Sequence, residues 1–226
     1  MEKINIAIDG PSAAGKSTIA NTLAAKLHYV HLDTGAMYRC TACKALQQHL
    51  NLDDENQIAD MLAHTEIVLT PEGKVFLDGK DVSEEIRHED ISLAASRVSK
   101  LKRVRQDLVK RQQVMAAAKG FIMDGRDIGT VVLPDAEVKV FLTASPMARA
   151  RRRYLQDKEK GLQVESVAQI AAEIAERDKQ DTTRKESPLV KAADAVEIDT
   201  SDLSFDESAD AVYRLVKAYF AKEKQA

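Results

Sequence analysis

The stretch that decides the fold is Gly10-Pro11-Ser12-Ala13-Ala14-Gly15-Lys16-Ser17-Thr18. Its first eight residues match the phosphate-loop pattern GxxxxGK[ST]. An apolar run over residues 4–9 precedes the motif, and an amphipathic run over residues 16–27 follows it. Because the pattern stands between a predicted strand and a predicted helix, we interpret it as a phosphate-binding loop rather than as a glycine-rich turn.

The residue types in this loop are those that an anion requires. Gly10 and Gly15 allow backbone conformations and a close approach that a Cβ would block, so that successive N–H groups can converge on phosphate oxygens. The following helix directs its unpaired N–H groups to the same place. Lys16 would reach the β- and γ-phosphates, and the Ser17 hydroxyl is placed to ligate Mg²⁺. The motif therefore predicts a nucleoside triphosphate bound with Mg²⁺.

The rest of the chain alternates short apolar strands with helices. Besides residues 4–9, we expect strands over residues 29–32, 121–124, 138–142 and 195–198, and helices over 16–27, 36–50, 91–99, 101–118, 146–161 and 206–220, with a further helical pattern from 167 to 174. This order is typical of a parallel sheet with helices on both faces. The prediction is a three-layer α/β/α fold with a five-stranded parallel sheet.

Residues 52–87 interrupt this pattern. Two short alternating runs, 66–69 and 74–77, are joined by Thr70-Pro71-Glu72-Gly73, and Asp78-Gly79 adds a second turn. We interpret them as a small antiparallel sheet within an inserted subdomain. The expected domains are a core of residues 1–38 and 100–226, with a helical lid at about 146–163, and an insertion of residues 39–99.

The composition excludes several classes of protein. The chain has 226 residues, 33 Lys and Arg against 36 Asp and Glu, a net charge of −3 and 44% hydrophobic residues. These values argue against a disordered chain and against binding to nucleic acid through overall basicity. No run of residues reaches the roughly 18 apolar positions of a membrane span, and no signal peptide is recognisable. We expect a cytoplasmic monomer with neither a membrane nor a nucleic acid as partner.

Cys40 and Cys43 form a CxxC motif downstream of His28 and His31. A zinc or redox site is one interpretation. However, the two cysteines lie within one predicted helix without the turn that would bring four ligands together. We favour two small buried helix residues and two histidines that flank a short strand.

A phosphate loop alone leaves a small-molecule kinase, a GTPase and an ATPase motor open. A GTPase should carry Asn-Lys-x-Asp, but Asp178-Lys179-Gln180-Asp181 lacks the Asn, and a motor usually needs a longer chain. Phosphoryl transfer needs fixed positive charge. Five arginines are expected near strand ends or just beyond helices, where they could converge: Arg39, Arg105, Arg126, Arg177 and Arg184. Asp124, at the end of a predicted strand, could hold Mg²⁺ through water.

Residues 149–160 contain six basic and two acidic side chains and begin with Arg149-Ala150-Arg151-Arg152-Arg153. A nucleic-acid patch is one interpretation, but aromatic residues are scarce between these charges. We favour a mobile lid that closes over the triphosphate.

Taken together, the motifs of this chain resemble the bacterial cytidylate kinases, which convert CMP and dCMP to diphosphates. The resemblance covers nearly the whole chain and rests on IAIDGPSAAGKST (6–18), LDTGAMYR (32–39), AASRVSKLKRVR (94–105), MDGRDIGTVVLPDA (123–136) and the segment from Arg177 to Leu189.

The resemblance implies a role for each matched position. Residues Gly10 to Thr18 would bind ATP with Mg²⁺; Ser96, Arg105 and Asp127 would face the cytosine, with Thr34 nearby. Arg177 and Asp181 would meet the sugar hydroxyls, and Arg39, Arg126 and Arg184 the CMP phosphate. Arg149 and Arg153 are the expected lid arginines, and catalysis would rest on Lys16, Arg126, Arg184, Arg149 and Arg153. No residue stands out as a general base.

Two other functions stay open from the sequence. One is a phosphate-loop kinase of another acceptor, such as UMP, shikimate or dephospho-coenzyme A. The other is a nucleotide-gated module that binds nucleic acid through residues 149–153.

Overall fold

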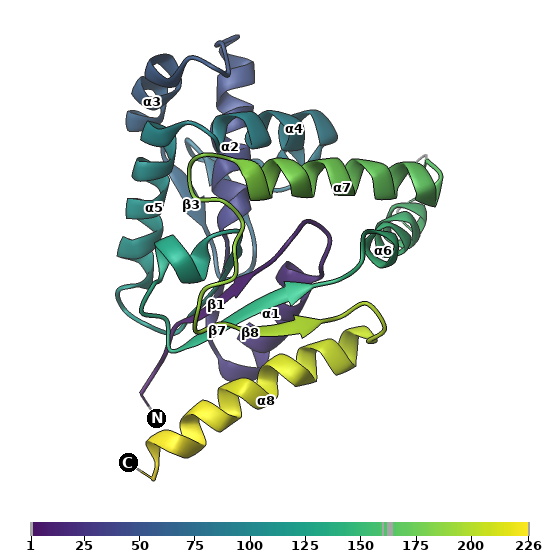
Figure 1. Cartoon of the computed structure of the whole chain (residues 1–226). Coiled ribbons are helices and arrows are strands. Elements are labelled where there is room, and N and C mark those ends of the chain that lie inside the picture. The colour runs from purple at the N-terminus through teal and green to yellow at the C-terminus, as the bar shows by residue number, and fades with distance from the viewer. Residues whose placement is uncertain (1, 160, 162–164, 226) are drawn as a thin grey trace.

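The structure is a computed structural model and describes residues 2–159, 161 and 165–225. Its main sheet has five parallel strands in the order β2-β6-β1-β7-β8 (Figure 1). These strands are β1 (Ile6–Asp9), β2 (Val30–Asp33), β6 (Phe121–Gly125), β7 (Val138–Thr143) and β8 (Val196–Asp199). Each predicted strand is confirmed, with ends that differ by at most two residues.

Side-chain alternation along β1 explains the three layers. Ile6 and Ile8 point to one face of the sheet, where they pack with α1 (Lys16–Leu27) and α8 (Phe205–Glu223). Ala7, between them, points to the opposite face and packs with the end of α5 (Lys102–Ala116) and with the π-helical turn η2 (Ile128–Val132). Because successive strand residues face opposite sides, three apolar residues of β1 serve two separate cores.

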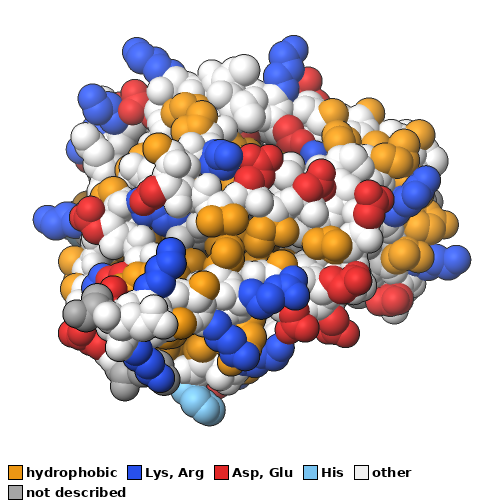
Figure 2. Space-filling model, turned by 60° about the horizontal axis from the view of Figure 1, so that its bottom comes forward, with side chains coloured by type: hydrophobic (Ala, Val, Ile, Leu, Met, Phe, Trp, Pro, Cys, Tyr) orange, Lys and Arg blue, Asp and Glu red, His pale blue; other side chains and the backbone are white. Residues whose placement is uncertain are grey.

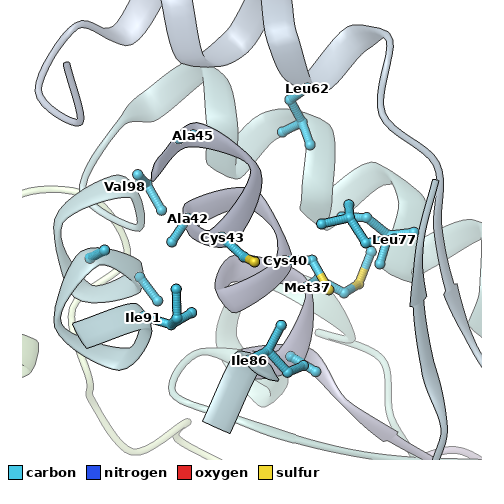
Figure 3. Close-up of a cluster of buried hydrophobic side chains, with 14 of the residues drawn as sticks. Met37, Cys40, Ala42, Cys43, Ala45, Leu62, Leu77, Ile86, Ile91 and Val98 are labelled. Atoms are coloured by element: carbon cyan, nitrogen blue, oxygen red, sulfur yellow. The ribbon is translucent and has the colours of Figure 1, made fainter. Parts of the chain in front are cut away.

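The insertion contributes a further core around helix α2 (Thr34–Gln47). Met37, Cys40 and Cys43 of α2 point into it and meet side chains of the surrounding elements (Figure 3). These elements are α3 (Glu55–Ala63), β3 (Ile67–Leu69), β4 (Val75–Leu77), the 3-10 helix η1 (Glu85–Arg87), α4 (Glu89–Val98) and α5. The short strand β5 (Lys80–Asp81) pairs with β4 but is exposed. Both cysteines are buried, as the sequence predicts, and burial raises the pKa of Cys40 to about 12 and that of Cys43 to about 11.

The antiparallel sheet of the insertion is confirmed, in the order β3-β4-β5. Helix α3 is absent from the sequence prediction, although its signals are present. Asp54 caps the helix by accepting the backbone N–H groups of Asn56 and Gln57. Ile58, Met61 and Leu62 then follow at helical spacing and are buried. The predicted boundary between residues 38 and 39 falls inside α2.

Two further helices extend from the carboxyl end of the sheet. Helix α6 (Pro146–Glu159) follows β7 and packs on α7 (Val167–Thr183) through Ala150, Ile170 and Ile174. Of the predicted lid, residues 160, 162 and 163 lie outside the described part of the chain. Among the described residues, no helix has the length and apolar character needed to cross a membrane.

Gly10 packs closely against the backbone of β7. Its φ is +150°, and a Cβ there would lie 2.1 Å from the carbonyl oxygen of Leu142 in β7. We expect Gly10→Ala to lower the free energy of unfolding by on the order of 3 kcal/mol, because strained φ and a backbone clash add.

Gly73 provides a control, since its φ is +80° but nothing lies within 4 Å of a Cβ at that position. Gly73→Ala should therefore cost only ~1 kcal/mol, which is the strain alone. Urea unfolding of both variants measures the difference; equal losses would contradict the clash.

Candidate active site

The phosphate loop joins β1 to α1 and leaves the first turn of that helix open. Gly15 is the N-cap residue, with φ of +88°, and provides no side-chain cap for the helix. Lys16 opens the helix, is almost fully buried and donates to the carbonyl oxygen of Pro11 at 2.7 Å. Burial, followed by repulsion from Arg126, lowers the pKa of Lys16 to about 7. Uncapped N–H groups and a poorly solvated ammonium group favour the binding of an anion here.

Ser17 and Asp124, the two residues predicted to hold Mg²⁺, contact each other. The Ser17 hydroxyl donates to Oδ2 of Asp124 at 2.8 Å, joining the start of α1 to the end of β6. The other oxygen of Asp124 lies 2.6 Å from Nε2 of His31 in β2. Burial alone would lower the pKa of His31, but the hydrogen bond and charge of Asp124 outweigh it and raise the pKa above its ordinary value. From the sequence, His31 was expected only to flank a strand; its contact with Asp124 corrects that interpretation.

Asp9 is a second site residue that sequence reasoning missed. Its two carboxylate oxygens accept the backbone N–H groups of Ile128 and Gly129, each at 2.7 Å. These bonds tie the end of β1 to the turn that follows Arg126 and Asp127. Burial raises the pKa of Asp9 to about 6 in spite of the two donors. An aspartate directly before the phosphate loop was the only sequence signal.

A cavity of about 230 Å³ lies between the phosphate loop, the carboxyl ends of β2 and β6, and the insertion. It is lined by most of the predicted nucleotide-binding residues: Ser12, Ala13, Lys16, Ser17, Thr34, Arg39, Ser96, Arg105, Asp124, Arg126, Asp127, Arg177, Asp181 and Arg184. Gly10, Pro11, Ala14, Gly15 and Thr18 belong to the loop but do not line the cavity. A larger, shallower hollow beside Ala63 to Val68 contains none of the predicted site residues.

The five arginines converge, but the expectation of where they lie in the chain is wrong for three of them. Arg126 follows β6 and Arg184 is the C-cap of α7, as expected. The other three lie inside helices: Arg39 in α2, Arg105 in the first turns of α5 and Arg177 in α7. They still meet because these helices present one side to the same edge of the sheet. For these three arginines, it is their place within a helix, and not closeness to a strand end, that brings them to the cavity.

Each of these arginines lies close to a carboxylate or to another guanidinium group. Arg39 donates to Asp33 at 2.6 Å, Arg126 donates to Asp181 at 2.8 Å, and Arg105 donates to the buried Asp127. Arg184 lies 3.8 Å from Asp127, too far for a hydrogen bond. Burial and repulsion from Arg126 lower the pKa of Arg177 to about 10.

Several guanidinium N–H groups in this cluster are buried without a partner. Within the described part of the chain, four such atoms are Nε of Arg39, Arg105 and Arg177 and one terminal nitrogen of Arg184. Buried unpaired donors are costly, so a cluster of them marks a place that an anion would stabilise.

Two hydroxyl groups around the cavity donate hydrogen bonds to backbone carbonyl oxygens. Thr34 donates its hydroxyl to the carbonyl oxygen of Asp124 at 2.8 Å, and Ser96 donates to the carbonyl oxygen of Ser92 at 3.3 Å. Tyr38, which the sequence analysis did not select, also lines the cavity, with the Arg105 guanidinium 5.5 Å from its ring centre. Its position next to Arg39 in the sequence was the available signal.

The two expected lid arginines do not line the cavity. Arg149 is buried at the base of α6, where it donates to Asp178 at 2.5 Å and to the carbonyl oxygens of Ala144 and Ser12. In this structure Arg149 is therefore an anchor between α6, α7 and the phosphate loop rather than a free lid group. Arg153 is more exposed and lies 3.6 Å from Asp157.

The fold and this site define a phosphate-loop phosphotransferase of the α/β class. In a comparison with solved structures, a gluconokinase from Sinorhizobium meliloti 1021 matches with a TM-score of 0.51 at 12% identity, covering 100% of this chain and 98% of that one. An uncharacterized protein from Eubacterium ventriosum matches with the same TM-score at 14% identity, covering 96% of this chain and 99% of that one. At such identities the likeness concerns the fold.

Sequence comparisons identify the family. The family model described as cytidylate kinase matches residues 6–218. The cytidylate kinase of Bacillus velezensis is 51% identical over 96% of this chain and 97% of its own length. That of Caldicellulosiruptor bescii is 50% identical over 96% and 99%. The chain belongs to the cytidylate kinase family and is an ATP-dependent nucleoside monophosphate kinase, which confirms the resemblance inferred from its motifs.

The raised pKa of Asp9 makes stability depend on pH. Because the folded pKa of about 6 exceeds the ordinary 3.8, the folded state binds more protons between these values, and stability falls as pH rises through that window. Between pH 4.5 and 6.5 this loss is on the order of 2 kcal/mol. We expect Asp9→Asn to remove that loss, so urea unfolding at the two pH values should show a smaller decrease than in the unaltered protein. The same decrease in both proteins would contradict the assignment.

Proposed function

We propose that the cavity binds CMP or dCMP and that ATP lies across the phosphate loop, so that the γ-phosphate of ATP meets the acceptor phosphate among the arginines. The observation that carries this proposal is the convergence of five guanidinium groups, four with a buried unpaired nitrogen, opposite Lys16. Two anionic substrates repel each other, and fixed positive charge offsets that repulsion.

Three groups of side chains would contact the base, the sugar and the phosphate of the acceptor. Ser96, Arg105 and Asp127, with Thr34 nearby, face the cytosine, which offers an amino donor beside ring acceptors. Arg177 and Asp181 meet the sugar hydroxyls, while Arg39, Arg126 and Arg184 hold the phosphate. The ion pair between Arg126 and Asp181 supports this order, because it links the sugar-binding group to the phosphate-binding group.

The donor set at Ser17 and Asp124 fits Mg²⁺. Both residues present hard oxygen atoms, already 2.8 Å apart, next to the loop that would hold the triphosphate. No cluster of three or more acidic, histidine or cysteine side chains suited to a metal occurs among the described residues. Such a cluster is not required, because Mg²⁺ in phosphate-transfer sites takes most of its ligands from phosphates and water. Ser17 would ligate it directly and Asp124 through water, and the bound ion would neutralise charge on the β- and γ-phosphate oxygens.

The chain contributes positioning and charge rather than a general base. The acceptor phosphate is largely dianionic at neutral pH, since its second pKa is about 6, so its oxygen needs no deprotonation before attack. Lys16, Arg126 and Arg184 would stabilise the charge that develops on the transferred group. Arg153 would act from the lid side, and the buried Arg149 would hold the base of α6 beside the phosphate loop.

Closure of two mobile parts would exclude water. We infer that residues 39–99 form the CMP-binding subdomain and that residues about 146–163 form the lid over ATP. Without closure, water would compete with CMP for the γ-phosphate.

We also infer a cytoplasmic monomer. The proposed site draws every group from one chain. On the face in Figure 2, basic side chains are interspersed with acidic and hydrophobic ones.

Asp127 should decide which base is accepted. With CMP, dCMP, UMP, AMP and GMP tested in a coupled assay for ADP formation, we expect CMP and dCMP to give the highest kcat/KM. Asp127→Asn should lower kcat/KM for CMP by ~10–100-fold, the effect of one buried recognition bond, and narrow the ratio of CMP to UMP.

The KM for ATP should change by less than about threefold in Asp127→Asn, because Asp127 lies on the acceptor side. Preference for AMP or GMP would overturn the acceptor, and an unchanged CMP to UMP ratio would overturn the role of Asp127. Thermal unfolding with ATP bound checks that loss of the Arg105 partner leaves the fold intact.

Nucleotide binding should be linked to proton uptake by Lys16. With a pKa of about 7, this amine is mostly neutral at pH 8 in the free protein, whereas a bound polyphosphate favours the charged form. We expect ADP binding at pH 8 to take up close to one proton, measured by calorimetry in buffers of different ionisation enthalpy.

The nucleotide itself contributes little at that pH, because its phosphates are already ionised. Lys16→Met should abolish the uptake and remove most turnover while cooperative unfolding remains. Uptake that persists in Lys16→Met would show that another group titrates.

A further inference from the structure

Four side chains beside the phosphate loop are linked by three hydrogen bonds, and helix α1 completes the ring. Ser17 donates to Oδ2 of Asp124 at 2.8 Å, and Nε2 of His31 lies 2.6 Å from Oδ1 of the same carboxylate. Nδ1 of His31 lies 2.8 Å from Oδ1 of Asn21. Ser17 and Asn21 are one turn apart on α1, so the helix itself closes the ring.

Strand register explains why His31 reaches Asp124. In the parallel pair β2 and β6, His31 stands opposite Ile122 and Asp33 stands opposite Asp124. Residues two apart on a strand point to the same face, so His31 and Asp124 share the face on which α1 packs. The imidazole therefore lies diagonally across from the carboxylate and between it and the helix.

The ring leaves the Asp124 carboxylate little freedom. The side chains of His31 and Asp124 are only 9% and 5% exposed, so water cannot readily replace the contact between them. Oδ1 is occupied by His31, and Oδ2 is thereby directed at Ser17. A carboxylate held by one partner alone could rotate and carry Oδ2 away from that hydroxyl.

We propose that His31, braced by Asn21, is a positioning residue that holds Asp124 in the orientation required at the Mg²⁺ site. The inference rests on the proposed function, which assigns Asp124 to that site. His31 touches neither the metal nor a substrate; it acts through the carboxylate. Outer partners of this kind usually change metal affinity by 10–100-fold when they are removed.

The test separates metal affinity from nucleotide affinity and from folding. Mn²⁺ is titrated into the full chain with saturating ADP, and the spectrum of free Mn²⁺ is followed by electron paramagnetic resonance. We expect His31→Leu to weaken Mn²⁺ binding about tenfold. The Kd for ADP without metal should stay within about twofold, since the loop amides and Lys16 are untouched.

Rescue distinguishes positioning from simple loss of packing. His31→Gln keeps an amide N–H that can donate to Asp124, and it should recover most of the Mn²⁺ affinity. His64→Leu, at an exposed histidine far along the chain, should leave both affinities unchanged. If His31→Leu does not fold, Asn21→Leu carries the same test, because it removes the brace from the imidazole.

Three results would overturn the proposal or its basis. Unchanged Mn²⁺ affinity in the folded His31→Leu or Asn21→Leu variant would show that Asp124 needs no such support. Equal losses in His31→Leu and His31→Gln would also reject the hydrogen bond as the cause. Unchanged affinity in Asp124→Asn would reject the metal assignment itself, whereas a loss there without a loss in His31→Leu rejects only the role of His31.

Discussion

The register of β1 against β6 is the constraint on which the site depends. It places Ile8 opposite Asp124 and Asp9 opposite Gly125, so the phosphate loop and the Arg126–Asp127 turn leave neighbouring strands at the same level. Asp9 then fixes the second segment to the first through two backbone hydrogen bonds. A slip of one residue would turn the side chains of β6 to the opposite face and separate Ser17 from Asp124. The geometry of the site is therefore a property of the sheet rather than of its loops.

Burial of several guanidinium groups next to Lys16 requires compensation before any nucleotide binds. Aspartates supply it, since Asp33, Asp127 and Asp181 each pair with an arginine of the cluster. Buried charges that lack a partner cost several kcal/mol each, in the range of about 3–5 when one member of a pair is removed. The pairing is incomplete, however, because one nitrogen on each of four arginines has no partner among the residues that the structure describes. The site is thus stable enough to fold and still retains donors for an anion.

The sequence predicted the elements of this fold better than it predicted their contacts. Local patterns were sufficient for the phosphate loop, the five strands and the antiparallel sheet, because turn residues and hydrophobic periodicity are short-range signals. Helix α3 was not predicted because it is short and lies in a stretch rich in turn signals. The site roles of Asp9 and His31 were not predicted for a different reason. Their partners lie 119 and 93 residues away, and only the sheet register brings them together.

Arg149 restricts how the proposed lid could move. Its guanidinium joins the end of β7, the phosphate loop and α7 through Ala144, Ser12 and Asp178, and its side chain is only 3% exposed. Movement of the base of α6 would break all three contacts and leave a charge buried without partners. Ala150 also packs against Ile170 and Ile174, so α6 and α7 share one small core. A closing motion that keeps these contacts must therefore carry both helices together or bend the lid beyond Arg149, toward the more exposed Arg153.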